Sequence, residues 1–286
     1  MNAQLTLVAG AGQMGSGIAQ TLLQSGRSVI LVDINDASLE RGAAAIRTGL
    51  AKSAAKGKIS SGELEQAQSR LTCSASLEEA AEQAEFVIEA APEVMTVKQA
   101  LFRTLDARCA AGVILATNTS SLSITEIAAV TRRPENVIGM HFMNPVPLMP
   151  LVEIIRGLAT SDDTFGQVEA LAVSLGKTPL AVRDYPGFVS NRVLMPMINE
   201  AVYAVYEGVA SPETVDGIMR LGMNHPMGPL ALADLIGLDT CLSIMETLHD
   251  GFGDSKYRPC PLLRLYVKAG WLGKKCGRGF YQYESQ

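Results

Sequence analysis

The spacing of apolar positions along the chain changes once, near residue 185. Before that point, short runs rich in Val, Ile and Leu alternate with segments whose apolar positions recur every three or four residues. The short runs predict strands and the longer segments predict helices, as Met14, Ile18 and Leu22 illustrate. The predicted strands are Leu5–Ala9, Ser28–Val32, Leu71–Cys73, Phe86–Glu89, Val113–Thr117, Val137–His141, Leu151–Ile155 and Pro179–Arg183. This alternation predicts an α/β domain with a doubly wound, mostly parallel sheet and helices on both faces.

From Gly187 onward the pattern is helical throughout. The predicted helices are Gly187–Glu207, Ser211–Leu221, Pro229–Leu235, Asp239–His249 and Pro261–Ala269, and Pro or Gly punctuates their ends. A chain of 286 residues is near the size at which one core divides into two. We therefore expect a sheet domain over residues 1–185 and an all-α C-terminal domain over residues 186–286.

One connection within the sheet domain is unusually long. Residues 36–68 exceed what a single crossover helix needs, so they predict an inserted helical hairpin. Between residues 47 and 62 this hairpin carries Arg47, Lys52, Lys56 and Lys58 and no acidic residue. The chain as a whole is acidic, with a net charge of −5, so this local basic cluster predicts a site for an anionic ligand.

Composition excludes several classes of protein. The acidic balance argues against nucleic-acid and membrane-surface partners, which both favour an excess of cations. The N-terminus has no pattern of a secretory signal, and the weakly charged stretch 137–155 contains three prolines, which disfavours a membrane helix. The five cysteines are scattered and lack CxxC spacing, so we expect reduced thiols, no metal site and a cytoplasmic protein.

A glycine-rich motif follows the first predicted strand and opens the next helix. Gly10 permits a tight turn, Gly12 lets the backbone approach a pyrophosphate, and Gly15 permits close packing of helix on strand. Gln13 and Met14 lie between them, at a helix start whose N–H groups can face the phosphates. The motif in this setting predicts a Rossmann-type dinucleotide site.

The second predicted strand ends in Asp33, 18 positions after Gly15. A carboxylate at this point accepts hydrogen bonds from the ribose hydroxyls and repels a 2′-phosphate, so we expect NAD as cofactor in preference to NADP. The alternative is a simple glycine turn with a solvated aspartate. The combination of strand, glycines, helix and acid favours the dinucleotide.

A dehydrogenase that takes hydride from an alcohol carbon also needs a base for the hydroxyl proton, and histidine is the usual choice. The chain has three histidines. His141 ends a predicted strand, where ligands of open α/β sheets bind, whereas His225 flanks a helix and His249 lies late in one. Position favours His141 as the base, with a buried structural histidine as the alternative.

Five further segments resemble the 3-hydroxyacyl-CoA dehydrogenase family. They are TNTSSLSI (117–124), GMHFMNPVP (139–147), LVEII (151–155), DYPGFVSNR (184–192) and LGKKCGRGFY (272–281). Their order and spacing follow the family, with GAGQMG in front, and together they span essentially the whole chain. The chain is most similar to the short bacterial 3-hydroxybutyryl-CoA dehydrogenases, which carry no hydratase domain.

The resemblance implies roles for four catalytic residues. His141 is the base, and Glu153 on the next predicted strand holds the imidazole tautomer and stabilises the imidazolium. Ser120 and Asn191 form a polar pair that orients the substrate at its 3-oxygen and thioester carbonyl. On position alone, Glu153 is equally compatible with a surface pair, Ser120 with a helix N-cap and Asn191 with an ordinary first-turn residue.

The resemblance also implies further ligand contacts. Glu93, Lys98, Asn144 and Lys275 fall where the family contacts NAD, and Ser120 is shared between cofactor and substrate. The alternatives are solvated helix charges for the three charged residues and a pre-proline turn for Asn144.

For coenzyme A, Lys56 matches a basic residue of the family's inserted hairpin, and Lys52 lies one turn earlier on the same face. A merely soluble helix end is the alternative. The sequence departs from the family at three positions: Gly49 replaces a small hydroxyl residue that touches CoA, Met143 replaces a second Phe, and Pro150 replaces a Lys.

The resemblance thus implies oxidation of an (S)-3-hydroxyacyl-CoA by NAD⁺, with 3-hydroxybutyryl-CoA as the expected substrate, in the cleft of a homodimeric enzyme whose helical domain forms the dimer. Two other interpretations stay open. The chain can oxidise a CoA-free hydroxy or sugar acid, or it can be a non-catalytic, crystallin-like NAD-binding protein. The basic hairpin argues against the first and the complete catalytic set against the second. Acyl-chain length is left open, including a dicarboxylic hydroxyadipyl chain.

Overall fold

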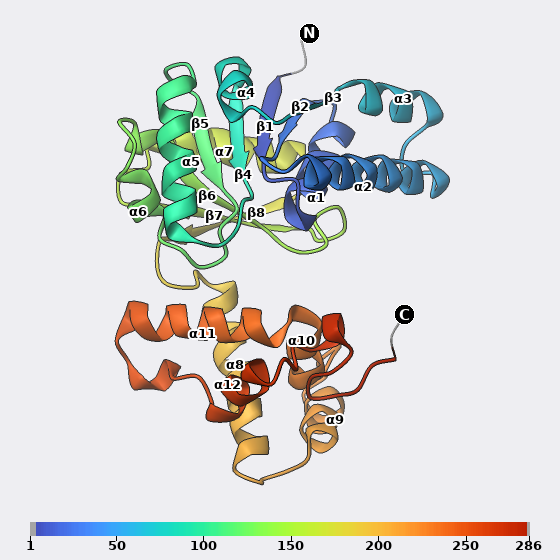
Figure 1. Ribbon diagram of the computed structural model, residues 1–286, viewed down its shortest axis with the longest axis vertical. Coiled ribbons are helices and arrows are strands. Elements are labelled where there is room, and N and C mark those ends of the chain that lie inside the picture. The colour runs from blue at the N-terminus through green and yellow to red at the C-terminus, as the bar shows by residue number, and fades with distance from the viewer. Residues whose placement is uncertain (1–3, 285–286) are drawn as a thin grey trace. The chain divides into compact units, whose positions relative to one another are not determined.

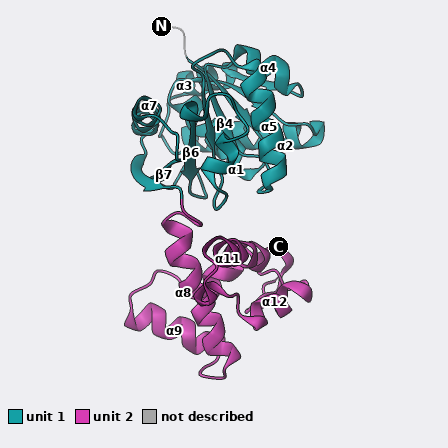
Figure 2. Cartoon of the chain, turned by 90° about the vertical axis from the view of Figure 1, so that its left-hand side faces the viewer, with its two compact units in different colours: residues 1–184 teal, residues 185–286 magenta. Residues whose placement is uncertain are grey.

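The computed structural model describes residues 4–284 and divides into two compact units. Unit 1 comprises Met1–Asp184 and unit 2 comprises Tyr185–Gln286 (Figure 2). The sheet and its helices belong to unit 1, and unit 2 is built of helices (Figure 1).

Unit 1 contains an eight-stranded sheet in the order β3-β2-β1-β4-β5-β6-β7-β8. Its strands are β1 (Leu5–Ala9), β2 (Ser28–Val32), β3 (Leu71–Ser74), β4 (Phe86–Glu89), β5 (Ile114–Thr117), β6 (Val137–Phe142), β7 (Leu151–Arg156) and β8 (Thr178–Arg183). All neighbouring strands are parallel except β6 and β7, which are antiparallel. The predicted doubly wound, mostly parallel sheet is confirmed, and each predicted strand lies within one residue of an observed one at either end.

The helices of unit 1 flank this sheet (Figure 1). They are α1 (Gln13–Gln24), α2 (Asp36–Ala55), α3 (Ser61–Ser69), α4 (Leu77–Gln83), α5 (Met95–Arg108), α6 (Ile124–Ala128) and α7 (Asp162–Ser174), with the short 3₁₀ turn η1 (Pro134–Asn136). Helices α2 and α3 form the hairpin expected between β2 and β3. Asn35 caps α2 by accepting from the Ser38 N–H, and Ser60 and Glu63 form a capping box on α3.

Helix α2 approaches the start of α1 closely. A Cβ atom on Gly42 would lie 2.6 Å from the carbonyl oxygen of Ala11 and 3.1 Å from Oγ of Ser16, so a larger residue would force the helices apart. In α1, Ile18 and Leu22 are fully buried in the core that α1 shares with the sheet, as their spacing predicts. The start of α1 is therefore fixed from two sides, by the sheet and by α2.

Unit 2 has its own apolar core. Its helices are α8 (Ser190–Tyr206), α9 (Pro212–Gly222), α10 (Pro229–Ile236), α11 (Leu238–Phe252) and α12 (Pro261–Lys268), with the 3₁₀ turns η2 (Ser255–Tyr257) and η3 (Lys274–Cys276). The predicted all-α character is confirmed. Helix α8 begins three residues later than predicted because Gly187 and Phe188 have φ values of 71° and 52°, in the left-handed region that a helix cannot contain.

A buried aspartate pins the C-terminal segment of unit 2 to α10. The Asp234 carboxylate, 1 % exposed, accepts hydrogen bonds from the N–H groups of Phe280 and Tyr281 and from the Tyr283 hydroxyl. Desolvation raises the pKa of Asp234, and these three donors partly offset that effect. The aromatic residues near the C-terminus are thus part of the fold of unit 2.

Candidate active site

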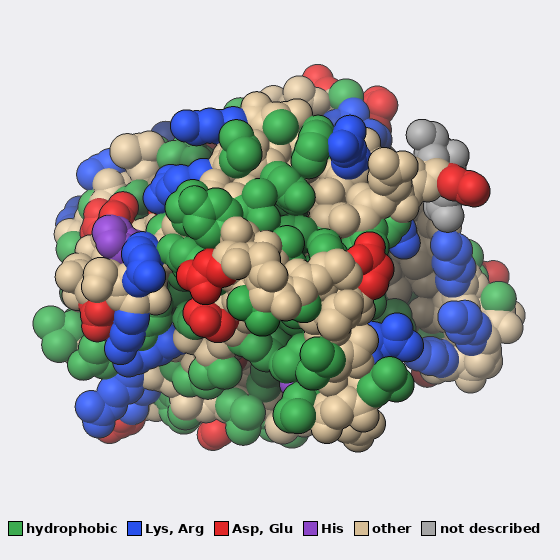
Figure 3. Space-filling model, turned by 90° about the horizontal axis from the view of Figure 1, so that it is seen from below, with side chains coloured by type: hydrophobic (Ala, Val, Ile, Leu, Met, Phe, Trp, Pro, Cys, Tyr) green, Lys and Arg blue, Asp and Glu red, His purple; other side chains and the backbone are tan. Residues whose placement is uncertain are grey.

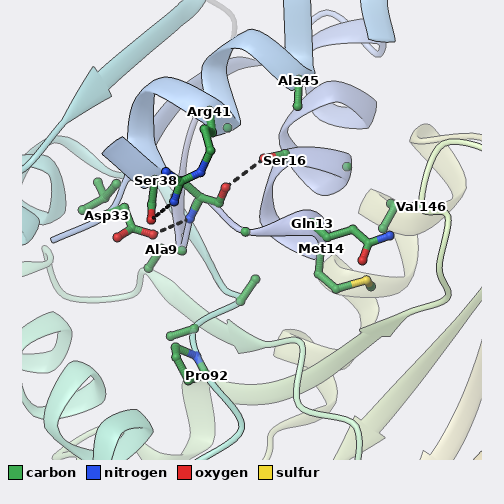
Figure 4. A pocket seen from close by; sticks show the side chains of 18 of the residues that line it. Ala9, Gln13, Met14, Ser16, Asp33, Ser38, Arg41, Ala45, Pro92 and Val146 are labelled. Carbon is green, nitrogen blue, oxygen red and sulfur yellow. Dashed lines mark hydrogen bonds between the residues drawn. The ribbon is translucent and has the colours of Figure 1, made fainter. Parts of the chain in front are cut away.

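A cavity of about 940 Å³ opens in unit 1 at the carboxyl ends of β1, β2 and β4. Figure 4 shows it bordered by the glycine loop after β1, the start of α2 and the segment around Val146. The carboxyl edge of a doubly wound sheet, next to the first helix, is the usual ligand position of such folds. Several residues singled out in the sequence line this cavity, among them Gly12, Gln13 and Asp33.

The glycine loop has the geometry its motif requires. Gly10 has a φ of 111°, and a Cβ on Gly15 would lie 1.8 Å from the Gly10 carbonyl oxygen, so neither position tolerates a side chain. A Cβ on Gly12 would meet no protein atom within 4 Å and would project toward the cavity that Gly12 lines. Gln13 and Met14 also line the cavity (Figure 4). Gly15 is buried and contributes packing alone.

Asp33 lies at the edge of the cavity, held by two backbone donors. Its Oδ2 accepts from the Ala11 N–H at 2.9 Å and its Oδ1 from the Asn35 N–H at 3.0 Å. The bond from Ala11 fastens the end of β2 to the glycine loop (Figure 4). A carboxylate beside the start of α1 fits the ribose of a dinucleotide whose phosphates face the helix N-terminus.

The wall beyond Asp33 is apolar, and sequence reasoning missed it. Ile34 is 91 % exposed and lines the cavity, as do Pro92, Val97 and Leu101. A flat aromatic base fits such a wall better than water does. A large apolar residue directly after the acid that follows β2 is the signal that would have found Ile34.

His141 and Glu153 face each other on adjacent antiparallel strands. They are register partners in the β6–β7 pairing, and Nδ1 of His141 lies 2.8 Å from Oε2 of Glu153. His141 is 6 % exposed and Glu153 is 3 % exposed, so the two hydrogen-bonded side chains are almost entirely removed from water. The twelve-residue separation in sequence closes because the chain turns back between Met143 and Pro150.

Lys98 lies in the interior of unit 1. Its Nζ lies 2.7 Å from Oε1 of Glu89 and 3.4 Å from Oε2 of Glu93, and its side chain is 1 % exposed. The alternative of a solvated helix charge is therefore wrong for Lys98. Glu89, fully buried at the end of β4, also accepts from the Thr117 hydroxyl at 2.6 Å and was missed in the sequence. An acid at the end of a buried strand, nine residues before a lysine, was the available signal.

Glu93 organises the loop that carries Ser120. Its Oε1 accepts from the Thr119 hydroxyl at 2.6 Å, from the Ser120 N–H at 2.8 Å and from the Ser121 N–H at 3.1 Å. Ser120 is not the cap of the next helix, since Ser123 accepts from the Glu126 N–H in that position. Glu93 and Lys98 thus connect β4, β5 and the Ser120 loop by charge-assisted hydrogen bonds.

Asn144 lies on the opposite wall of the cavity, where its Oδ1 accepts from Nε2 of Gln13 at 3.2 Å. Asn144 lies in the connection between β6 and β7, which Lys177 holds in place. The Nζ of Lys177 donates to the carbonyl oxygens of Val146 and Met149 at 2.5 and 2.8 Å. Burial lowers the pKa of Lys177. Lys177 gave no signal in the sequence, because a lysine just before an edge strand is normally solvated.

The remaining site residues lie outside the cavity. Lys52 is in the last turn of α2 and Lys56 is its C-cap residue, and both are exposed. Asn191 lies in the first turn of α8 and is 8 % exposed. Lys275 pairs with Asp239, with Nζ 2.6 and 2.7 Å from the two carboxylate oxygens. Asn191 and Lys275 belong to unit 2, and the others to unit 1.

Two family models match nearly the whole chain. The model described as "3-hydroxyacyl-CoA dehydrogenase, NAD binding domain" matches residues 6–185, and the model described as "3-hydroxyacyl-CoA dehydrogenase, C-terminal domain" matches residues 187–283.

Within residues 4–284, no helix combines the length and the apolar character that a membrane span requires.

Relatives of the chain cover 96 % of it or more. A probable 3-hydroxybutyryl-CoA dehydrogenase of Bacillus subtilis (strain 168) is 63 % identical over 286 residues, covering 100 % of this chain and 99 % of that protein. A 3-hydroxybutyryl-CoA dehydrogenase of Bradyrhizobium diazoefficiens is 51 % identical, covering 96 % and 94 %. The crystal structure of (S)-3-hydroxybutyryl-CoA dehydrogenase PaaH1 from Ralstonia eutropha superposes with a TM-score of 0.95 at 49 % identity, covering 99 % of this chain and 100 % of that one.

Proposed function

The chain belongs to the 3-hydroxyacyl-CoA dehydrogenase family, and from that premise we propose that it oxidises (S)-3-hydroxybutyryl-CoA to acetoacetyl-CoA with NAD⁺. It is an NAD-dependent oxidoreductase of this class. The observation that supports the proposed reaction most is the buried His141–Glu153 pair at 2.8 Å, a base with its orienting carboxylate. Relatives named for 3-hydroxybutyryl-CoA support the short acyl chain.

The residues of unit 1 fit the cofactor. The open space at Gly12, the start of α1 and the Asp33 carboxylate suit the pyrophosphate and a ribose without a 2′-phosphate. We assign Gly10, Gly12, Gln13, Met14 and Asp33 to this binding, with Gly15 acting through packing. When bound, NAD⁺ supplies the hydride acceptor of the reaction.

The His141 ring is set up to accept a proton. Because Nδ1 is paired with the Glu153 carboxylate, the neutral ring carries its hydrogen on Nδ1, and Nε2 takes the hydroxyl proton of the substrate. The imidazolium that forms is then stabilised by the adjacent negative charge of Glu153. In the reverse direction the same nitrogen returns the proton to the 3-oxygen.

Polar residues complete the proposed site. We assign Ser120 and Asn191 to the 3-oxygen and the thioester carbonyl of the substrate. Glu93 supports this role by holding the Ser120 backbone, and Glu93, Lys98, Asn144, Ser120 and Lys275 remain the proposed further contacts of NAD. Of these, Asn144 alone lines the cavity of unit 1.

The basic end of α2 suits the nucleotide part of coenzyme A. Lys52 and Lys56 are exposed, and neither has a described acidic partner, so both can bind the 3′-phosphate and the diphosphate. The long CoA chain would then run from this end of α2 toward the catalytic pair.

Unit 2 exposes apolar side chains that suit a homodimer interface. Ile218 and Leu221 on α9 are 57 % and 88 % exposed, and Met223 beyond its end is 61 % exposed. Figure 3 shows apolar side chains gathered across the middle of the face that it presents. Exposed apolar side chains favour association with a second copy when they lie together on one face. We place this dimer in the cytoplasm, without nucleic-acid or membrane partners.

The proposal is tested by following NADH oxidation at pH 7 with acetoacetyl-CoA and, separately, with free acetoacetate. We expect turnover of the thioester and little or none of the free acid, because the CoA contacts would be lost. Equal turnover of both would indicate a CoA-free hydroxy-acid dehydrogenase instead. Binding of NADH without turnover of either substrate would indicate a non-catalytic protein.

A further inference from the structure

The side chain of Gln20 faces the cavity of unit 1 and belongs to neither the glycine motif nor the catalytic pair. Gln20 is on the second turn of α1, is 8 % exposed and lines the cavity. Within residues 4–284 the Gln20 carboxamide makes no hydrogen bond. It is not fully buried either, because among these residues Nε of Arg70 is the single side-chain nitrogen or oxygen that is both fully buried and unpaired. The Gln20 carboxamide is therefore unpaired but open to the cavity.

The carboxamide occupies a place that residue 49 leaves vacant. A Cβ on Gly49 would lie 2.1 Å from Oε1 of Gln20 and 2.7 Å from its Cδ. Any side chain at position 49 would displace the head group of Gln20. Gly49 is also the position where resemblance to the family leads us to expect a small hydroxyl residue that touches CoA. In this chain the polar group found there belongs to Gln20.

Gly49 lies in a stripe along α2 that joins the cavity to the basic end of the helix. The stripe is formed by Gly42, Ala45, Gly49, Lys52 and Lys56, whose spacings of three and four place them on one face. Gly42 and Ala45 line the cavity, and the lysines lie at the other end. The stripe is about 21 Å long at 1.5 Å per residue, with Gln20 beside its midpoint.

The chemistry of coenzyme A between its diphosphate and its sulfur matches this stripe. That pantetheine arm is a slender chain with two secondary amides. A carboxamide offers both an N–H donor and a C=O acceptor, so it can pair with either group of such an amide. On the facing side, Val146 packs directly on α1, since a Cβ on Gly17 would lie 3.0 Å from its Cβ. Gly17, Gln20 and Val146 line this part of the cavity, where the Gln20 carboxamide is an unpaired amide.

We propose that Gln20 recognises the substrate by hydrogen-bonding an amide of the pantetheine arm, in the space that Gly49 leaves open. This inference rests on the proposed acyl-CoA dehydrogenase function. It adds a substrate contact on α1, the helix whose start binds the cofactor. Gln20 touches neither the reacting carbon nor the base, so its contribution is to binding, equal in the ground state and the transition state.

The test replaces Gln20 by Met, which has a similar length and no hydrogen-bonding amide. We expect Gln20→Met to raise KM about tenfold for acetoacetyl-CoA and for acetoacetyl-pantetheine, with kcat and the Kd for NADH retained. A nucleotide-binding residue would affect the CoA thioester alone, so equal effects on the two substrates locate the contact on the pantetheine arm. Gln24→Met, four residues later on α1 and outside the cavity, is the matched control and should leave all these constants unchanged.

Two outcomes would overturn the assignment. One is an unchanged KM for both thioesters in Gln20→Met, and the other is a weakened Kd for NADH, which would make Gln20 a cofactor residue. Failure of the wild-type protein to reduce acetoacetyl-CoA would instead refute the proposed function. The two failures are therefore distinguishable.

The link to Gly49 has its own test. The methyl group of Gly49→Ala would occupy the place of the carboxamide, so this variant should raise the KM for both thioesters without affecting NADH binding. When Gly49→Ala is combined with Gln20→Met, KM should rise little further, because the contact is already lost. An unchanged KM in Gly49→Ala, or additive rises in the double variant, would contradict the shared space.

Discussion

At the scale of single residues, Asp33 combines a structural role with the recognition role that we propose for it. Its carboxylate is held by the N–H groups of Ala11 and Asn35, so it cannot swing away from the cavity without losing both bonds. A 2′-phosphate placed beside it would bring two negative charges into a partly desolvated space. We therefore expect cofactor choice to depend on this one side chain, whose position is fixed by backbone donors.

We expect kcat/KM for NADH to exceed that for NADPH by about 10²-fold, the effect of one unfavourable charged contact. Asp33→Ser should reduce this ratio, mainly by loss of NADH affinity. Asp36→Ser is the control, because Asp36 is exposed in the first turn of α2 and lines no cavity. Steady-state kinetics with both cofactors measure the ratio. Equal kcat/KM values for NADH and NADPH in the wild-type protein would contradict the assignment of Asp33 to cofactor choice.

At the scale of elements, α2 provides two parts of the proposed CoA site, the stripe beside Gln20 and the basic cluster at the end of the helix. Lys56→Ala should raise KM for acetoacetyl-CoA while leaving kcat nearly intact, because a contact made equally in both states is lost. Acetoacetyl-pantetheine, which has no 3′-phosphate, should be affected little. Lys268→Ala, at the exposed end of α12, serves as the control. Equal weakening of both thioesters, or of neither, would show that the cluster is only a solvated helix end.

The β6–β7 connection depends on a buried lysine. Because burial lowers the pKa of Lys177, the folded protein binds fewer protons than the unfolded chain between the lowered pKa and the ordinary value of 10.5. Stability contributed by Lys177 must therefore rise with pH through that window. Relative to Lys177→Met, the wild-type free energy of unfolding should increase as pH rises from the lowered pKa of Lys177 toward 10.5.

Urea unfolding of both proteins at several pH values measures this difference. Lys268→Met is the matched comparison, since Lys268 is exposed and its difference from wild type should stay constant with pH. A pH-independent difference for Lys177→Met would mean that Lys177 is hydrated in the folded protein. The Val146 and Met149 carbonyls would then be fastened by something other than this amine.

Elements were predictable from sequence where the apolar period was long or the motif was local. The strands and α1 were found because buried runs and a spacing of four are strong signals. The antiparallel pairing of β6 with β7 was not predictable from either strand. It is, however, what places His141 opposite Glu153. The resemblance to the family identified the pair, and the register gives the physical reason for it.

At the scale of the whole molecule, the sequence did not reveal the polar side chains that position other residues of the site. Glu89 and Lys177 belong to no ligand-binding motif. Glu89 nevertheless holds Lys98 and the end of β5, and Lys177 holds the Asn144 connection, through buried hydrogen bonds. Gln20 belongs to no motif that the sequence analysis singled out. In each case the polar group is buried by residues distant in sequence, so a local pattern carries no trace of its partner.

Association of two copies is tested by placing a charge on α9. We expect Leu221→Arg to shift the protein from dimer to monomer in sedimentation velocity runs, because a buried unpaired cation is costly. Leu158→Arg is the control, since Leu158 is 90 % exposed in unit 1 and should leave the dimer intact. A monomeric wild-type protein, or a dimer unaffected by Leu221→Arg, would exclude α9 as the interface.

The catalytic pair carries the whole chemical proposal, and a double-mutant cycle on it is the most direct measurement. Loss of a positioned base costs about 10²- to 10⁴-fold, so His141→Ala should lose that much in kcat with acetoacetyl-CoA while its Kd for NADH is retained. Glu153→Gln should also lose activity, because the imidazolium loses its counter-charge. The double variant should be little worse than His141→Ala alone, since the carboxylate then has no ring to orient. Additive losses would show that Glu153 acts independently of His141, and would contradict the base-and-carboxylate pair.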